Sequence, residues 1–219
     1  MLQRFVMTKK RNYYLSVMGT MGSGKTTVAK LISRVFKLHL LEENFGENAF
    51  LSRFYKDMPR WAFHSQTFFL MEKISQMLET PKLLERFSVV QDTPIEQDVF
   101  SYAKAQYVLG NIDEAEWKLY QKIYKSFAPY FAKTDLIVYL ETPINILFER
   151  IDQRGRDYEQ KIPKSYLELL DMLNHKWLSE NKHLNILKIE TDGLNIVKSK
   201  KAQNTMLALI KTKLGGLKY

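Results

Sequence analysis

Short apolar runs alternate along the chain with longer stretches in which apolar residues recur at helical spacing. Five runs are short and largely apolar, as expected for parallel strands that are covered on both faces. They span residues 13–18, 37–42, 87–91, 135–141 and 185–190. The predicted helices span residues 25–36, 59–79, 94–109, 113–131, 143–154, 161–181 and 194–213. The pattern therefore predicts an α/β fold in which helices flank a five-stranded parallel sheet.

Several helix boundaries carry signals of their own. Pro59, Pro94 and Pro143 each stand near a predicted helix start, where a missing backbone N–H costs nothing. Asp113 is a favourable cap for the helix that follows it. No repeat, low-complexity tract or linker interrupts the pattern, so residues 1–219 are predicted to form a single domain.

The segment after the first predicted strand reads G-T-M-G-S-G-K-T, which is the G-x-x-x-x-G-K-[ST] pattern of a phosphate-binding P-loop. Its glycines allow backbone N–H groups to surround a β-phosphate, and the following helix directs its positive end at the anion. Lys25 would reach the β- and γ-phosphate oxygens, and Thr26 would ligate Mg²⁺. The residues predicted to hold ATP are Gly19, Thr20, Met21, Gly22, Ser23, Gly24, Lys25, Thr26 and Thr27.

Composition narrows the class of protein. The 219 residues include no cysteine, which excludes disulfides, thiolate metal sites and a cysteine nucleophile. No segment approaches the roughly 18 apolar residues of a membrane span, and the basic N-terminus lacks the apolar stretch of a signal peptide. We therefore expect a soluble enzyme with no membrane partner, located in the cytoplasm.

The formal net charge of +9 allows two interpretations. Phosphate-handling proteins carry basic loops, and many lysines here lie in a solvated C-terminal stretch. Nucleic-acid binding is the alternative. The basic residues are spread along the sequence, however, without an aromatic and basic patch of the kind that grips single strands. We therefore expect no nucleic-acid partner.

Acidic residues follow the second and third predicted strands, where ligands of open parallel sheets bind. Glu42 and Glu43 follow the second strand, and Asp92 follows the third. Asp92 could hold Mg²⁺ or accept the proton of an attacking hydroxyl. The alternative is a helix N-cap before Thr93-Pro94, since aspartate is a favoured cap.

Three arginines, Arg150, Arg154 and Arg156, surround a possible hinge at Gly155. Arg150 and Arg154 are four residues apart, which places both on one helix face. They suit a lid over residues 150–162 that closes on the transferring phosphoryl group, neutralises its charge and excludes water. The alternative is an ordinary charged surface turn, in which neighbouring acidic residues pair with the arginines.

The segment from Trp61 to Leu70 is aromatic and nearly uncharged, which indicates a buried helix. Gln66 is the exception within it, because an amide carries a donor and an acceptor side by side and can match the edge of a nucleobase.

Taken together, these motifs resemble the deoxynucleoside kinases, P-loop enzymes that phosphorylate the 5′-hydroxyl of deoxyribonucleosides. The resemblance covers about residues 13–190 and rests on Arg150-x-x-x-Arg154-x-Arg156-x-x-Glu159 and on the Trp61–Gln66 block. It implies a P-loop kinase fold with a helical, arginine-rich lid, ATP and Mg²⁺ as donor and metal, and a homodimer.

The resemblance also assigns roles to residues around the reacting hydroxyl. It implies that Asp92 is the general base and that Glu43, or its neighbour Glu42, faces the 5′-hydroxyl. It further implies that Tyr55 and Glu159 hold the sugar 3′-hydroxyl.

Three residues are implied to contact the base, namely Gln66, Lys73 and Asp98. Lys73 stands where the family usually has arginine, and Thr93 stands where an arginine normally follows the catalytic acid. We expect a lid arginine to supply part of the charge of that missing arginine.

Two alternative functions remain open for the chain. One is a thymidylate-type nucleoside monophosphate kinase, and the other is a P-loop nucleotide-binding protein with weak or lost catalysis.

Overall fold

The structure is a computed structural model that describes residues 11–43, 45–156, 159, 162–193, 196 and 199–215. Its centre is a five-stranded sheet in the order β2-β3-β1-β4-β5, and all neighbouring strands are parallel. The strands are β1 (Tyr14–Gly19), β2 (His39–Leu41), β3 (Val89–Asp92), β4 (Leu136–Glu141) and β5 (Ile186–Glu190). The predicted α/β fold and parallel sheet are confirmed.

Strand register decides which residues meet at the carboxyl edge of the sheet. Strand β1 lies at the centre, and its Val17 pairs with Asp92 of β3 while its Gly19 pairs with Leu140 of β4. The loop that leaves β1 therefore begins beside the end of β3. This register places the P-loop and Asp92 at one edge.

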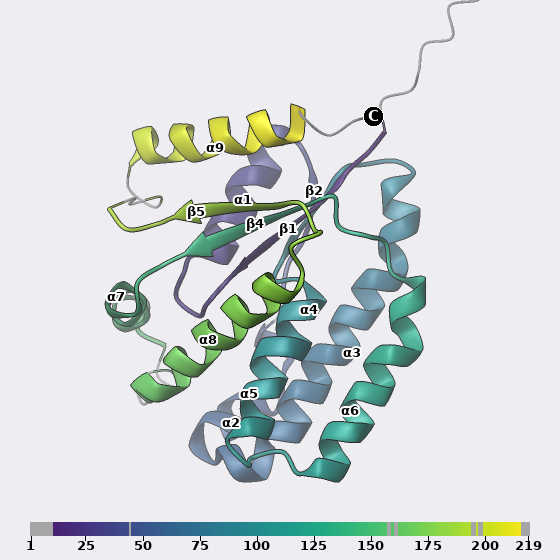
Figure 1. The fold of residues 1–219 in the computed structure, drawn as a ribbon, viewed down its shortest axis with the longest axis vertical. Helices are drawn as coiled ribbons and strands as arrows, with labels where there is room; N and C mark the ends of the chain where they lie inside the picture. The colour runs from purple at the N-terminus through teal and green to yellow at the C-terminus, as the bar shows by residue number, and fades with distance from the viewer. Residues whose placement is uncertain are drawn as a thin grey trace, which may run out of the picture.

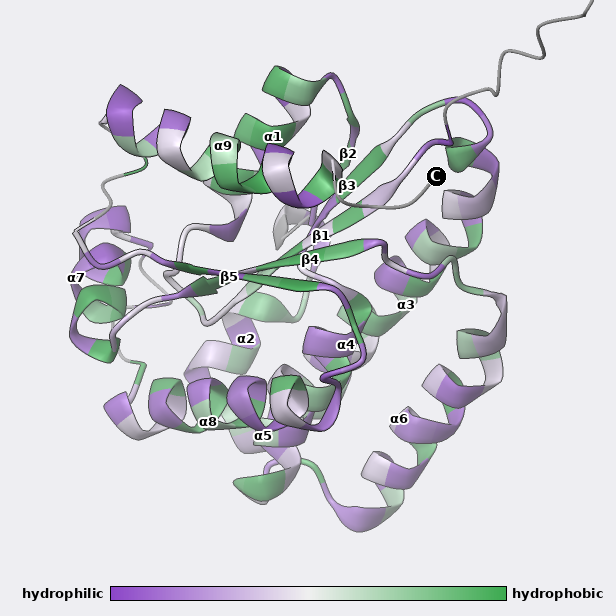
Figure 2. Cartoon of the chain, turned by 45° about the horizontal axis from the view of Figure 1, so that its top comes forward, coloured by the Kyte–Doolittle hydropathy of each residue, from purple (hydrophilic) through white to green (hydrophobic). Residues whose placement is uncertain are grey.

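Helices cover both faces of the sheet (Figure 1). Helices α1 (Lys25–Phe36) and α9 (Lys200–Gly215) lie on one face, over alternate β1 residues such as Leu15 and Val17. The opposite face, which includes Tyr14, packs against the other helices. Those are α2 (Leu51–Lys56), α3 (Met58–Leu84), α4 (Ile95–Gln97), α5 (Lys104–Val108), α6 (Glu114–Phe127) and α8 (Lys164–Glu180). In Figure 2 the strands and the sheet-facing sides of helices are hydrophobic, and the outer sides are hydrophilic.

Two segments differ from the sequence-based expectation. The helix expected over 94–109 contains a π-helix, Asp98–Ala103, between α4 and α5. Helix α2 was not predicted, because its six residues are too short to show a helical period. The expected cap at Asp113 is confirmed, since its carboxylate accepts a hydrogen bond from the Glu116 N–H at 2.8 Å.

Helix α7 (Ile144–Arg154) lies at the carboxyl edge of the sheet (Figure 1) and ends at Gly155, which has a φ of 65°. Of the helices in the described residues, none is both long and apolar enough to cross a membrane.

Candidate active site

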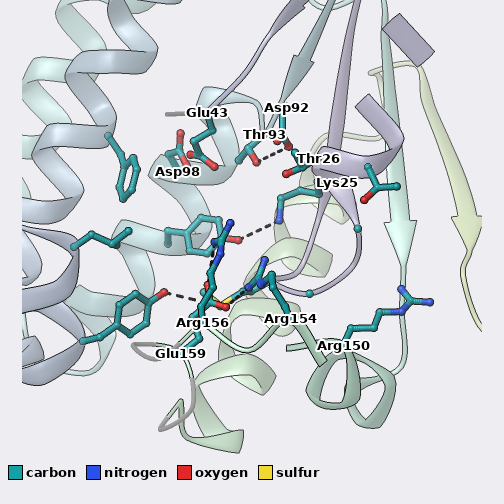
Figure 3. A pocket seen from close by; sticks show the side chains of 18 of the residues that line it. Lys25, Thr26, Glu43, Asp92, Thr93, Asp98, Arg150, Arg154, Arg156 and Glu159 are labelled. Atoms are coloured by element: carbon teal, nitrogen blue, oxygen red, sulfur yellow. Dashed lines mark hydrogen bonds and ion pairs between the residues drawn. The ribbon is translucent and has the colours of Figure 1, made fainter. Parts of the chain in front are cut away.

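A cavity of about 460 Å³ opens at the carboxyl edge of the sheet (Figure 3). Its walls come from the P-loop, the segments after β2 and β3, helices α2 and α3, the π-helix and the end of α7. Pockets of this size, lined by apolar walls with a few convergent polar groups, commonly hold small molecules. The predicted donor and acceptor residues therefore meet in one space.

The predicted nucleotide-binding residues divide into two groups. Those that line the cavity are Met21, Gly22, Gly24, Lys25, Thr26 and Thr27. Gly19, Thr20 and Ser23 do not line it, and Thr20 and Ser23 are buried. Gly22 has a φ of 85°, and a Cβ there would lie 2.9 Å from the Leu147 carbonyl oxygen of α7. This glycine therefore permits both the turn of the loop and the close approach of α7.

A polar frame holds the start of the P-loop from outside, and it is formed by the buried Gln97, Ser101 and Asn174 and the partly exposed Asp171. Gln97 donates to the Gly19 carbonyl at 2.7 Å and accepts from the Gly19 N–H at 3.3 Å. The Asn174 amide donates to the Thr20 hydroxyl at 3.1 Å, and its oxygen accepts from Gln97 and from Ser101. The Thr20 hydroxyl in turn donates to Asp171 at 3.0 Å. Sequence reasoning missed this frame, because its members lie more than 70 residues from the loop they contact.

Carboxylates and lysines gather beside the P-loop. Glu43 and Asp98 line the cavity with Asp92, and the side chain of Glu43 is 9% exposed. Burial raises the pKa of Glu43, and the nearby Asp92 charge raises it further, whereas Lys73 and Lys25 oppose the rise. Glu42 instead forms an exposed ion pair with Lys30. The structure thus brings Glu43 and not Glu42 to the cavity.

Asp98 has both a raised pKa and a carboxylate oxygen without a hydrogen-bond partner among the described residues. Burial and the Glu43 charge raise the pKa of Asp98 well above its ordinary value. Its Oδ2 atom is buried without a hydrogen-bond partner among the described residues. Because an unpartnered buried acceptor is costly, this oxygen indicates a ligand with an N–H or O–H donor.

Lys73 differs from the expectation that it contacts the base. It is 1% exposed, does not line the cavity, and donates to the Asp92 carbonyl oxygen at 2.7 Å. Its ammonium also lies 3.8 Å from Glu43 Oε1. The physical reason is the local charge, since a buried ammonium turns to the nearest acceptors. Lys73 rather than a lid arginine is therefore the cation held against the backbone of Asp92.

The alternative interpretation of Asp92 as a helix cap is wrong. The N-cap of α4 is Pro94, and no side chain caps that helix. Thr93, between them, has a φ of 63°. This left-handed conformation costs a β-branched residue about 1–2 kcal/mol. The turn after β3 is thus strained where it presents Asp92 to the cavity.

The arginines of the predicted lid separate into two groups (Figure 3). Arg154 and Arg156 both contact the buried carboxylate of Glu159, the latter at 3.3 Å. The Arg150 guanidinium points away from them and donates to the Ser23 and Thr191 carbonyl oxygens at 3.2 and 3.1 Å. All three arginines line the cavity, but the side chains of Arg150 and Arg154 diverge toward different acceptors. Their joint action on a phosphoryl group therefore stays a prediction.

The remaining predicted substrate residues line the cavity. Gln66 is buried on α3, and Tyr55 lies on α2 with its hydroxyl 4.0 Å from the sulfur of Met21. Tyr102 of the π-helix also lines the cavity and was not predicted. An aromatic residue in a largely apolar helix carries no sequence signal that separates it from a core residue.

One surface feature brings together basic and aromatic residues of two helices, α2 and α3. The guanidinium carbons of Arg53 and Arg60 lie 5.0 and 5.5 Å from the ring of Trp61, within the range of cation–π contacts. The fold thus gathers a small aromatic and basic cluster on α2 and α3 that the linear sequence did not reveal.

Comparisons with known proteins agree with this architecture. The family described as deoxynucleoside kinase matches residues 15–214. A deoxyadenosine/deoxycytidine kinase of Bacillus subtilis is 29% identical over 189 residues, 85% of this chain and 86% of the relative. A deoxyguanosine kinase of the same organism is 26% identical over 90% of this chain and 96% of the relative. The structure of M. mycoides deoxyadenosine kinase with bound dCTP superposes with a TM-score of 0.78 at 21% identity, covering 91% of this chain and 99% of that chain. With a P-loop and buried carboxylates in one cavity and a family match over nearly its whole length, the chain belongs to the deoxynucleoside kinase family.

Proposed function

We propose that this kinase transfers the γ-phosphoryl group of ATP to the 5′-hydroxyl of a deoxynucleoside whose base carries an amino group. The observation that carries the proposal is the shared cavity, in which Lys25 of the P-loop faces Glu43, Asp92 and Asp98. The donor phosphates would lie along the P-loop, and the nucleoside would lie against α2, α3 and the π-helix. Phosphoryl transfer then depends on positioning and charge neutralisation within that space.

Two carboxylates are placed to accept the proton of the 5′-hydroxyl. Asp92 is our first choice, because it is the last residue of β3 and pairs with Val17 of β1, just before the P-loop. Glu43 is the second choice, because its raised pKa makes the carboxylate a stronger base. Asp92→Asn should lower kcat roughly 10²-fold or more. A larger loss in Glu43→Gln than in Asp92→Asn would assign the proton to Glu43.

The metal fits the cavity as a partner of the donor phosphates. Mg²⁺ in such sites is bound mainly by substrate phosphates and water, with one or two ligands from the protein. Thr26 would supply a hydroxyl ligand, with Asp92 nearby. When bound, Mg²⁺ neutralises charge that develops on the phosphates.

The base preference follows from Asp98 and Gln66. The unpartnered Asp98 oxygen needs a donor, which the exocyclic amino group of adenine, cytosine or guanine provides. Thymine has no exocyclic amino group. Gln66 would then meet the remaining base edge, and Tyr55 and Glu159 would hold the 3′-hydroxyl.

The test is a panel of the four deoxynucleosides with ATP and Mg²⁺, read as monophosphate formed. We expect turnover of at least one amino-bearing nucleoside, with thymidine at least tenfold poorer in kcat/KM. Asp98→Asn should reduce this discrimination. Phosphorylation of nucleoside monophosphates alone would favour the thymidylate-type alternative, and binding without turnover would favour a protein that has lost catalysis.

A homodimer and a cytoplasmic location complete the proposal. Apolar side chains are exposed on the α5–α6 side of the molecule, among them Val108 at 52%, Leu109 at 47% and Leu119 at 49%. A second copy of the chain would cover such residues. Light scattering should give a mass of twice 25.9 kDa.

A further inference from the structure

Tyr102 of the π-helix lines the cavity and contacts the P-loop lysine. Its hydroxyl lies 3.3 Å from the Lys25 ammonium, an interaction drawn as a dashed line from Lys25 in Figure 3. The other hydrogen bonds of that ammonium in the described residues go to the carbonyl oxygens of Gly19 at 2.8 Å and Thr20 at 3.4 Å. Tyr102 is thus the side chain that binds the donor lysine from across the cavity.

The π-helix explains how one short segment serves both the cavity and the P-loop. Asp98 and Tyr102 line the cavity, whereas Ser101 of the same helix and Gln97, which directly precedes the helix, hydrogen-bond to Asn174 beside the P-loop. A π-helix is wider than an α-helix and commonly marks a functional site. Here it lets neighbouring residues contact the P-loop frame and the open cavity.

The Tyr102 hydroxyl attracts the Lys25 ammonium in the direction opposite to the two P-loop carbonyl oxygens. Lys25 has a flexible four-carbon stem, and the two loop carbonyls draw its ammonium back toward the start of the P-loop. Burial raises the pKa of Tyr102 well above its usual value, so this hydroxyl stays neutral. A neutral acceptor orients the ammonium without the charge attraction by which a carboxylate would compete with phosphate.

We propose that Tyr102 is a positioning residue for the donor lysine, whose hydroxyl holds the Lys25 ammonium toward the cavity where the triphosphate arrives. The proposal rests on the proposed function only in that ATP is the donor. It does not depend on which nucleoside is phosphorylated.

The hydroxyl also affects when Lys25 loses its proton. Burial lowers the pKa of Lys25, while Asp92, Glu43 and Asp98 raise it and Arg154 lowers it further. These groups face the ammonium from β3, the segment after β2, the π-helix and α7. Because a hydrogen bond donated by a charged ammonium is stronger than one donated by a neutral amine, loss of the Tyr102 hydroxyl should let Lys25 deprotonate at a lower pH.

The experiment compares Tyr102→Phe with the wild type. MgATP affinity is measured by calorimetry between pH 7 and 9.5, with the fold checked by circular dichroism. We expect affinity at pH 7.5 to fall about three- to tenfold, the size expected from the net contribution of one typical hydrogen bond. We also expect the alkaline loss of affinity to begin roughly half a pH unit lower.

Tyr120→Phe is the matched control, because the buried Tyr120 hydroxyl on α6 has no hydrogen-bond partner in the described residues and does not line the cavity. Tyr120→Phe should leave the loss of MgATP affinity at high pH, the alkaline limb, unchanged. An unchanged limb in Tyr102→Phe, or an equal shift in Tyr120→Phe, would overturn the proposal. A shift specific to Tyr102→Phe in a protein that turns over no deoxynucleoside would support this proposal and refute the proposed function.

Discussion

The P-loop and the arginine segment around Arg154 both direct cations into the same cavity, yet they are held in different ways. The start of the P-loop is fixed by the buried amides of Gln97 and Asn174. Arg154 and Arg156 share one carboxylate, and about a third of each arginine side chain is exposed. Partly exposed ion pairs stabilise weakly, whereas buried hydrogen-bond networks are costly to disturb. The donor loop is therefore set before the substrates bind, and the arginines are free to respond to them.

The largest effect on turnover should come from a substitution in the P-loop, the more firmly held of the two regions. Lys25→Ala removes the P-loop cation and should lower kcat by about 10³-fold or more, because an electrostatic group aimed at the transferring phosphoryl contributes several kcal/mol to transition-state binding. Turnover is measured with ATP and the best nucleoside, and thermal unfolding serves as the control. Wild-type turnover in a folded variant would remove Lys25 from the donor site.

The second-largest effect should be a difference between Arg154→Ala and Arg150→Ala in kcat and in Tm. Arg154→Ala should lower kcat roughly 10- to 100-fold with little change in Tm, because this arginine faces the cavity beside Glu159. Arg150→Ala should act more on Tm, because it removes the bonds that join α7 to Ser23 and Thr191. Equal loss of kcat in both variants would support the shared arginine face that the sequence suggested.

A smaller effect is expected at the sugar. If Tyr55 and Glu159 hold the 3′-hydroxyl, a 2′,3′-dideoxynucleoside should be a roughly tenfold or more poorer acceptor in kcat/KM, since buried groups lose their partner. Tyr55→Phe should narrow the difference between the two acceptors. The same kcat/KM for both acceptors with the wild-type enzyme would contradict this role.

The smallest effect should come from His175, at the outer edge of the P-loop frame. Partial burial alone would lower the pKa of His175, but hydrogen bonds to Glu141 and Asp171 outweigh burial and raise it. The stabilisation by the protonated ring is full below the unfolded pKa of about 6.5 and is lost as the pH rises through the folded value. His175→Gln should therefore lower Tm by roughly 1–3 °C at pH 6 and less at pH 9. A loss of Tm that grows with pH would contradict this assignment.

The sequence predicted the parts of the site that are local. The P-loop is contiguous, and Glu43 and Asp92 follow from the rule that strand ends meet at one edge. Tyr102, Gln97 and Asn174 could not be predicted, because each acts on residues about 75 or more positions away and nothing in its neighbourhood marks it.

Side-chain direction was the second limit of sequence reasoning. The spacing of Arg150 and Arg154 places both on one helix face, but it does not say which acceptors their long side chains will meet. Lys73 shows the same limit. Its position suggested a contact with the base, whereas in the structure its ammonium donates a hydrogen bond to the backbone carbonyl of Asp92.

The close approach of α7 to Gly22 has a consequence for mutational tolerance. Any side chain at this position would need both a left-handed backbone and a displacement of the Leu147 carbonyl. In a deep mutational scan that selects only for protein abundance, without ATP or turnover, position 22 should already reject nearly every substitution. Gly24, whose added Cβ would meet nothing within 4 Å, should show less depletion under the same selection. The two loop glycines, alike in the motif, would then be preserved for different reasons.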